Sequence, residues 1–238
     1  MKQLIKFSTV LLLTTTVLFF SSCDSDEDIS SSLDFHFHPK VGAEDFSFSK
    51  VFDINGVATQ FATAQFYVHG IELELEDETK SFENHLLVKA SQMVYSLGEV
   101  AKGTIKGIKF NVGVDSINNG QTEANFTSRT SDDPLSIQSP KMHWNWNMGY
   151  IFVKLEGMFD NDGDGTPDTP FEYHVGMNSM LRNIDLTANK AIMGDNMELM
   201  INVDYAQFFD GIDLKTNPTT HGMNAIFMDN IQSAFTVM

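Results

Sequence analysis

The sequence contains a single cysteine, and its position leaves most of the chain without a thiol. Cys23 lies near the N-terminus, and no cysteine follows it. Disulfides, a cysteine nucleophile and thiolate metal sites are therefore excluded from the rest of the chain. The sequence also lacks G-x-S-x-G, H-E-x-x-H and a phosphate-binding glycine loop. We accordingly expect a protein that is not an enzyme.

Basic residues are scarce. The chain has 15 Lys and Arg against 32 Asp and Glu, a net charge of −17. Removing residues 1–22 takes away two lysines and no acid, so the charge falls to 13 − 32 = −19. A chain with this excess of negative charge is a poor partner for nucleic acid or for an anionic membrane surface.

The N-terminus has the pattern of a secreted lipoprotein. Lysines precede the apolar run "VLLLTTTVLFF", and two serines then lead directly to Cys23. Residues 1–22 are predicted to be a signal peptide. A cysteine directly after small residues resembles the lipobox of bacterial lipoproteins, in which that cysteine is acylated. Signal cleavage beside an incidental cysteine is the alternative.

The next residues predict how the protein is attached. Residues 23–32 are acidic and rich in serine, and they are expected to form a flexible tether between the lipid on Cys23 and the folded part. The acidic run resembles the surface-export signal of Bacteroidetes lipoproteins. We expect an outer-membrane lipoprotein, on the cell surface or the periplasmic face, with residues 33–238 as one domain.

Apolar and polar residues alternate over much of this domain, which is typical of half-buried strands. Strands are expected at residues 33–38, 65–76, 85–90, 107–115, 151–157, 171–175 and 197–203. A helical pattern is present only at residues 224–235. The predicted fold is all-β, an antiparallel β-sandwich with one or two short helices. In "QFYVHGIELELE" the alternation changes phase at His69 and Gly70, which predicts either a β-bulge or a plain kink of an edge strand.

The segment "DNDGDGTPD" resembles an EF-hand-type calcium loop. Carboxylates stand at positions 1, 3, 5 and 9, with Gly165 at position 6, where the loop needs a sharp turn. The usual glutamate at position 12 is replaced by Phe171. We predict a structural calcium site formed by Asp160, Asp162, Asp164 and Asp168. A solvated hairpin that binds cations feebly is the alternative.

Histidines are the candidate ligands for a softer metal. His36 and His38 are two residues apart on a predicted strand, so they share a face. His174 lies on the polar face of its own strand, and His69 lies at the predicted bulge. We predict ligands of a soft or borderline metal ion among His36, His38, His69 and His174; the family resemblance described below implies that this metal is copper. His143 and His221 are less well placed, and His85 is expected on the surface. Methionines near His221 could supply thioethers to Cu(I), although methionine is also common core filler.

Several segments together resemble the MbnP-like family of copper-binding, methanobactin-associated proteins, in particular its Bacteroidetes lipoprotein branch. They are "FDINGVATQFATAQFYVHGIELEL", "YSLGEVAKGTIKGIKFNVGVD", "MHWNWNMGYIFVKLEG", "FEYHVG" and "NIQSAF". The match spans nearly all of the mature domain. The W-x-W segment and "YHVG" are its most distinctive parts.

The resemblance implies an extracytoplasmic protein that scavenges, carries or stores copper through histidines. It also implies that a tryptophan is oxidised to kynurenine by a partner di-haem peroxidase, with Trp144 and Trp146 as the candidates. The main alternative is a metal-independent sandwich that contacts glycan or protein through Trp144 and Trp146. Exposed indoles far from every histidine would favour that alternative. A copper oxidase is less favoured because no second catalytic group is evident.

Overall fold

The computed structural model describes residues 30–145 and 147–238. The predicted signal peptide, Cys23 and Trp146 lie outside the described residues. The first strand already begins at Ser30, so residues 30–32 belong to the folded domain and not to the predicted tether. Ser31 is fully buried, which a solvated tether would not allow.

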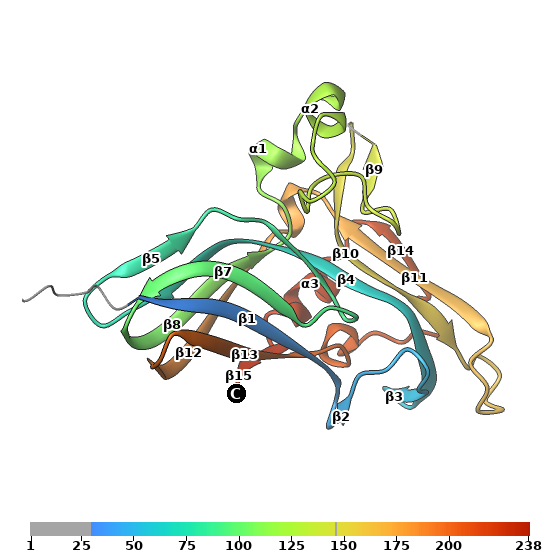
Figure 1. The fold of residues 1–238 in the computed structure, drawn as a ribbon. Coiled ribbons are helices and arrows are strands. Elements are labelled where there is room, and N and C mark those ends of the chain that lie inside the picture. The colour runs from blue at the N-terminus through green and yellow to red at the C-terminus, as the bar shows by residue number, and fades with distance from the viewer. Residues whose placement is uncertain (1–29, 146) are drawn as a thin grey trace, which may run out of the picture.

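Two β-sheets form the fold (Figure 1). The five-stranded sheet contains β15 (Phe235–Val237), β13 (Asn196–Asp204), β1 (Ser30–Val41), β2 (Glu44–Asp45) and β7 (Val94–Ala101). The main path of the ten-stranded sheet is β12 (Arg182–Ile192), β8 (Gly103–Val112), β4 (Val57–Glu74), β10 (Gly149–Phe159), β11 (Thr169–Gly176) and β14 (Thr219–Gly222). The other strands of this sheet are β3 (Phe52–Ile54), β5 (Thr79–Phe82), β6 (Leu86–Lys89) and β9 (His143–Asn145).

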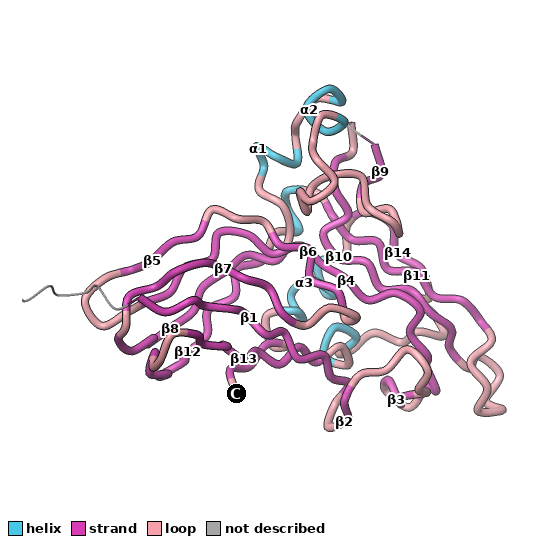
Figure 2. Tube along the Cα trace, in the orientation of Figure 1, coloured by secondary structure: helices cyan, strands magenta, loops and turns pink. Residues whose placement is uncertain are grey.

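Helices are few and short, as the colouring of Figure 2 shows. They are α1 (Ser116–Asn119), α2 (Glu123–Thr127) and α3 (Ala225–Ile231), with 3₁₀ turns at Asn178–Met180 and Gln207–Phe209. The all-β sandwich is confirmed, and the described part has three α-helices instead of one or two. In the residues the structure describes, no helix is both long and apolar enough to span a membrane.

The sheets are mixed, which corrects the purely antiparallel prediction. β1 pairs with β13 in parallel, and so does β11 with β14. Strand alternation does not reveal this, because it depends on burial and not on the direction of the neighbouring strand. Parallel pairing of β1 with β13 joins segments that are far apart in the sequence.

The core lies between the two sheets and is rich in phenylalanine. The ring of Phe37 on β1 contacts those of Phe66 on β4 and Phe110 on β8, each with a centroid distance of 6.2 Å. Edge-to-face contacts of this kind add to the stabilisation from burial. Side chains of opposite parity therefore point out of the sandwich, on one of its two outer faces.

The covering segment, residues 113–142, contains α1 and α2 and lies at the end of the ten-stranded sheet near β9 (Figure 1). The hydroxyl of Tyr67 on β4 donates to the carbonyl of Pro134, and that of Tyr150 on β10 donates to Leu135. The rings of Tyr67 and Tyr150 meet edge-to-face, with centroids 5.5 Å apart. These contacts hold the covering segment against β4 and β10 at Pro134 and Leu135.

The bulge predicted at His69 and Gly70 is confirmed. The pairing of β4 with β8 changes register between His69 and Glu72. Gly70 has a φ of +59°, a conformation that side-chain-bearing residues rarely adopt. The change of phase in the sequence therefore reports a real insertion in the strand.

Candidate metal centre

His174 and His221 form a cross-strand pair on the outer face of the ten-stranded sheet. β11 and β14 run in parallel, and their register places the two histidines directly opposite each other. The ring centroids are 4.8 Å apart, with the rings inclined by 58°. His174 lies between the buried residues Tyr173 and Val175, so its ring faces away from the core. Two imidazoles are thus within reach of one ion.

A carboxylate holds each of these rings by one nitrogen. Nε2 of His174 lies 2.6 Å from Oε1 of Glu156, and Nε2 of His221 lies 3.2 Å from Oε2 of Glu172. A carboxylate oxygen accepts a hydrogen bond from Nε2–H, which leaves Nδ1 unprotonated in a neutral ring. Carboxylates orient metal-binding histidines in this way in many proteins. Both rings therefore have Nδ1 available as a ligand.

The electrostatic surroundings keep His174 neutral. Burial lowers the pKa of His174, and the hydrogen bond to Glu156 offsets this only in part. For Glu156, burial acts to raise the pKa, but hydrogen bonds from Thr63, His174 and Lys154 outweigh it and leave the pKa below its usual value. Lys154 Nζ also lies 3.1 Å from Glu156 Oε1. The result is a charged carboxylate beside a neutral imidazole, the state that a metal ligand needs.

Trp144 lies against β11, two residues beyond His174. A Cβ atom placed on Gly176 would lie 2.8 Å from Cζ3 and 2.9 Å from Cη2 of the Trp144 indole. Residues 174 and 176 share a face of the strand and are about 6.6 Å apart along it. The half-buried indole therefore lies on the same face as His174. The absence of a side chain at Gly176 makes the room for it.

The structure does not bring His36 and His38 together with His174. On β1, His36 and His38 alternate with buried residues, so they face outward from the five-stranded sheet. His174 faces outward from the other sheet, and the core lies between them. Alternation identifies the outer face of each strand but not the sheet to which the strand belongs.

His69 is also separate from His174. On β4 and β10, Gln65 is opposite Lys154, which is opposite His174. His69 lies four residues beyond Gln65, about 13 Å along the strand. Nδ1 of His69 is 3.0 Å from the carbonyl oxygen of Gly113. The predicted role of His69 as a ligand beside His174 is therefore not supported by its position.

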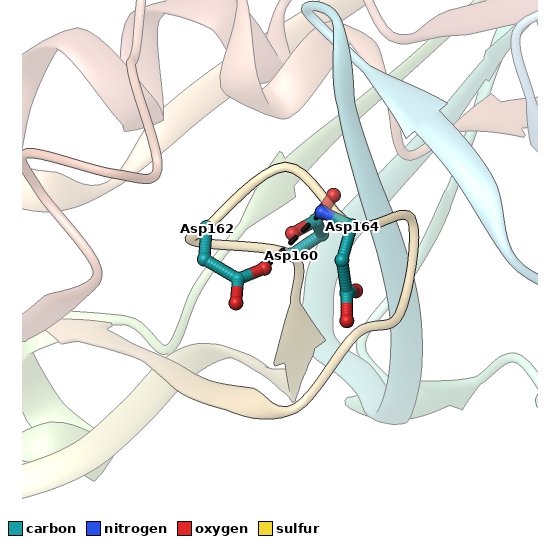
Figure 3. A group of neighbouring side chains, drawn as sticks. All are labelled: Asp160, Asp162 and Asp164. Carbon is teal, nitrogen blue, oxygen red and sulfur yellow. Dashed lines mark hydrogen bonds between the residues drawn. The ribbon is translucent and has the colours of Figure 1, made fainter.

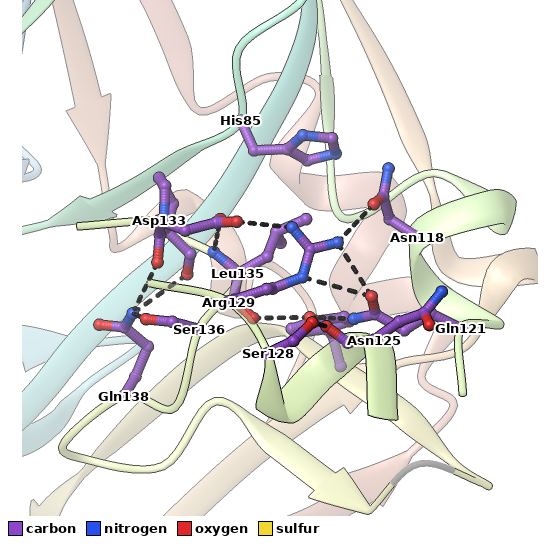
Figure 4. Close-up of polar contacts among 12 residues, drawn as sticks. His85, Asn118, Gln121, Asn125, Ser128, Arg129, Asp133, Leu135, Ser136 and Gln138 are labelled. Atoms are coloured by element: carbon purple, nitrogen blue, oxygen red, sulfur yellow. Dashed lines mark hydrogen bonds and ion pairs between the residues drawn. The ribbon is translucent and has the colours of Figure 1, made fainter. Parts of the chain in front are cut away.

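His85, expected on the surface, is half-buried and stacks on His69. The rings are 5.3 Å apart with an interplanar angle of 16°, so their in-plane lone pairs are nearly parallel and do not converge on one ion. Nε2 of His85 lies 2.9 Å from Asp115. Figure 4 shows His85 beside Arg129, whose guanidinium donates to Asp133 and Asn118 at 2.6 and 2.7 Å. This network holds the covering segment in place.

His143, next to Trp144, is a packing residue. Its ring stacks on Phe126 at 4.0 Å and meets the edge of Tyr150 at 4.8 Å. Burial, with a smaller contribution from the charge of Lys141, lowers the pKa of His143 to about 4. His143 is therefore neutral at ordinary pH and, by packing on Phe126 and Tyr150, anchors the backbone next to Trp144.

Three of the four predicted calcium ligands come together in the loop between β10 and β11 (Figure 3). Ligand oxygens of Asp160, Asp162 and Asp164 lie within 4.8 Å of one another. Asp168 is not part of this group. Each of the three carboxylates also accepts a backbone N–H within the loop, from Gly163, Asp164 and Thr166 respectively. Elsewhere in the described ranges, no three His, Cys, Asp or Glu residues gather in this way.

Sequence patterns hardly indicate His221, the neighbour of His174 across the strands. It lies in the short segment "TTHG", where no long alternation marks a strand. Its position depends on parallel pairing with β11, more than forty residues away, which local patterns do not specify. No single sequence motif contains the whole group. Glu156 lies on β10, Glu172 and His174 lie on β11, and His221 lies on β14.

Comparisons with known proteins agree with this architecture. MbnP from Methylosinus trichosporium has a similar structure, with a TM-score of 0.54 and 16% sequence identity over 82% of each chain. At 16% sequence identity, this similarity establishes a shared fold and nothing further. No curated protein matches the chain significantly. The MbnP family model matches residues 30–225, which is most of the chain. From this match, the chain belongs to the MbnP family.

Proposed function

We propose that this protein is an extracytoplasmic copper-binding lipoprotein that scavenges, carries or stores copper, with His174 and His221 as ligands. Membership of the MbnP family associates the chain with copper in general terms. The observation that carries the specific proposal is the adjacent pair of imidazoles, each held at Nε2 by a carboxylate. The protein acts as a binder and not as a catalyst.

The residues present fit copper. Neutral imidazole suits Cu(I) and Cu(II), and two such donors on neighbouring strands leave positions open for exchange. Glu156 and Glu172 add negative charge next to the rings, which increases the basicity of the ligand nitrogens. An ion bound here would lie on the surface of the sheet, accessible to a donor or an acceptor protein.

Trp144 is the indole that we propose as the target of oxidation. Its ring lies on the face of β11 that carries His174, next to Gly176. An electron-rich indole beside a copper site is a ready substrate for a partner di-haem peroxidase. Kynurenine would appear in an intact-mass measurement as the gain of one oxygen and the loss of one carbon. Peptide sequencing would then distinguish Trp144 from Trp146.

The lipid anchor belongs to the same proposal. Acylation of Cys23 would hold the domain at the outer membrane, on the cell surface or on the periplasmic face. The first described strand begins at Ser30, so residues 24–29 lie between that strand and the proposed lipid on Cys23. Labelling with a radioactive fatty acid tests this, because a Cys23→Ala variant should take up no label if the anchor is at this position.

The test of copper binding is a Cu(I) titration against a competing chelator. The mature chain should bind with high affinity, and His174→Gln with His221→Gln should remove this binding site. His85→Gln is the matched control, because glutamine can still donate to Asp115 and this histidine is outside the pair. If the double variant bound as many copper ions per chain as the control, the ligand assignment would be refuted.

The alternative, a metal-independent module that binds glycan or protein through Trp144 and Trp146, has less support. Trp144 is half-buried, and the benzene part of its indole packs against the backbone at Gly176. A sugar-stacking platform needs the open face of a ring in solvent. Glycan array binding that is abolished by Trp144→Ala, in a protein that binds no copper, would favour this function instead.

We also propose that the Asp160 loop holds calcium as a structural clip. Three converging carboxylate oxygens are suited to a hard cation. Two hydrogen bonds from the backbone at Gly163 and Gly165 lower the pKa of Asp160, so its carboxylate is charged at neutral pH. Calcium would tie together the ends of β10 and β11, the hairpin that carries Glu156 and His174.

A further inference from the structure

The outer face of the five-stranded sheet carries another group of potential soft-metal ligands. His36 and His38 lie on β1, and Met200 lies on β13 directly opposite His36 in the parallel register. Neighbouring strands are about 4.8 Å apart, so the two side chains start side by side. All three residues alternate with buried neighbours and are half-buried on the outer face. The rings of His36 and His38 are 6.3 Å apart.

His36 is arranged as a metal ligand. Its Nδ1 lies 3.1 Å from Oε2 of Glu198, whereas its Nε2 is buried and has no hydrogen-bond partner. With Nδ1–H donated to the carboxylate, the neutral ring directs an unshared lone pair at Nε2 into a dry position. A buried polar atom without a partner is costly unless something else satisfies it. A metal ion would do so.

His38 is also hydrogen-bonded to a carboxylate, but through Nε2 and not through Nδ1 as in His36. Its Nε2 lies 3.0 Å from Oδ1 of Asp45 on β2, which leaves Nδ1 as the free nitrogen. Two adjacent histidines, each held by its own carboxylate, match the outer-shell arrangement of many metal sites. The same face thus offers two imidazoles whose tautomers are fixed by Glu198 and Asp45.

The residues beside His36 on the neighbouring strands are methionine and valine. Met238 donates its backbone N–H to the carbonyl of Met200 at 3.0 Å, so a second methionine lies beside the first. On the other side, Val94 pairs with His36 and is exposed. Imidazole with thioether in an apolar setting favours Cu(I) and Ag(I) over Zn²⁺, Mg²⁺ or Ca²⁺.

We infer that His36, His38 and Met200 form a second binding site for a soft monovalent cation, Cu(I) or Ag(I). This site goes beyond the proposed function, because it lies on the opposite outer face from His174 and His221 and does not involve Trp144. The sheets of a sandwich are about 10 Å apart, so the two sites hold separate ions. The mature chain therefore binds two equivalents of Cu(I).

The test is a stoichiometric titration of the mature chain with Cu(I), and in parallel with Ag(I), against a competing chelator. The unmodified chain should bind two equivalents. His174→Gln with His221→Gln should keep one equivalent, and adding His36→Gln should remove it. Met200→Leu should weaken the remaining site at least about tenfold, whereas Met197→Leu, a core-facing change on the same strand, should not. Circular dichroism verifies that each variant is folded.

Methyl NMR gives a second measurement that does not depend on a variant. The ε-methyl resonance of Met200 should shift when Ag(I) is added to the His174→Gln, His221→Gln chain. One equivalent in the unmodified chain, lost entirely in that double variant, would overturn the second site but not the copper proposal. If the chain bound one equivalent that was lost with His36→Gln and unaffected by His174→Gln, the second site would stand and the assignment of His174 and His221 as copper ligands would be overturned. An unshifted Met200 methyl would also overturn the second site.

Discussion

At the scale of single residues, carboxylate support of histidine is the recurring feature. Five of the seven histidines have a ring nitrogen close to a carboxylate, as in His36 with Glu198 and His174 with Glu156. In an acidic chain some such pairs are expected from composition. Those on the outer faces differ because they occur as neighbours, with the second ring nitrogen left for a ligand.

Glu172→Gln tests this support without removing a ligand. Glutamine can still accept from His221 Nε2, but the negative charge next to the ring is lost. We expect Cu(I) affinity at the His174 site to fall about tenfold, the lower end of the range for outer-shell partners. Glu99→Gln is the control, since Glu99 is an exposed acid bonded to Ser30. A chelator competition that gives equal affinities for both variants would contradict the role of Glu172.

His143 makes stability depend on pH. Its pKa is about 4 in the folded protein against 6.5 as the ordinary value, so the unfolded state binds a proton first as the pH falls. The contribution of neutral His143 to the free energy of unfolding is complete above pH 6.5 and is lost as the pH falls toward 4. The difference between the two pKa values corresponds to about 3 kcal/mol in the free energy of unfolding.

His143→Phe removes this proton and keeps the stacking on Phe126. Urea unfolding between pH 7 and 4 should show a smaller loss of stability for the variant than for the unmodified chain. His85 and His174 have lowered pKa values in both proteins, so only the difference between the curves reports His143. Parallel curves would contradict the assignment.

At the scale of elements, Gly176 allows Trp144 to pack directly against the backbone of β11. A Cβ there would meet the Trp144 ring and the carbonyl oxygen of Tyr150. Gly176→Ala should cost about 1–3 kcal/mol, the usual range for overpacking, and should change the near-ultraviolet circular dichroism of Trp144 in a Trp146→Phe background. Gly103→Ala, at a strand position with open space, is the matched control. An unchanged spectrum would show that the ring does not rest on Gly176.

The Asp160 loop predicts a calcium effect on the β10–β11 hairpin. Calcium should raise the unfolding temperature of the mature chain, because it binds only the folded loop. Asp162→Asn with Asp164→Asn should abolish this increase. Asp77→Asn, in another turn of the same sheet, should leave it unchanged. If calcium stabilises the double variant as much as the unmodified chain, the loop is not the site.

Strand alternation predicted much of the fold because the apolar and polar residues of a half-buried strand alternate along its own sequence. The segment with Phe110 became β8, and the phase change at Gly70 became a bulge. The same patterns could not place β14, which is four residues long, or β9, which is three. Such short strands form because neighbours hold them and not because of their own sequence.

The site was predicted in part for the same reason. His174 was identified from the polar face of its strand, and the alternation of β1 placed His36 and His38 correctly on an outer face. The alternation could not show that His36 and His38 lie on the outer face of a different sheet from His174. The partner His221 and the neighbour Met200 both depend on parallel pairing between distant segments, which only the folded chain specifies.

At the scale of the whole molecule, the sandwich separates three sites. The proposed copper ligands lie on the outer face of the ten-stranded sheet, the proposed soft-metal ligands lie on that of the five-stranded sheet, and the aspartate loop joins β10 to β11. The core between the sheets is apolar and rigid, so loading one face need not disturb the other. An acidic surface with a net charge of −17 also favours the approach of cations.

The most direct test of the central claim is ¹⁵N NMR of the histidine rings during Cu(I) addition. If His174 and His221 hold the ion through their free nitrogens, their Nδ1 resonances shift together while Nε2 stays protonated toward Glu156 and Glu172. The variants His174→Gln and His221→Gln assign the signals. Saturation with copper that leaves both Nδ1 resonances unchanged would contradict the account.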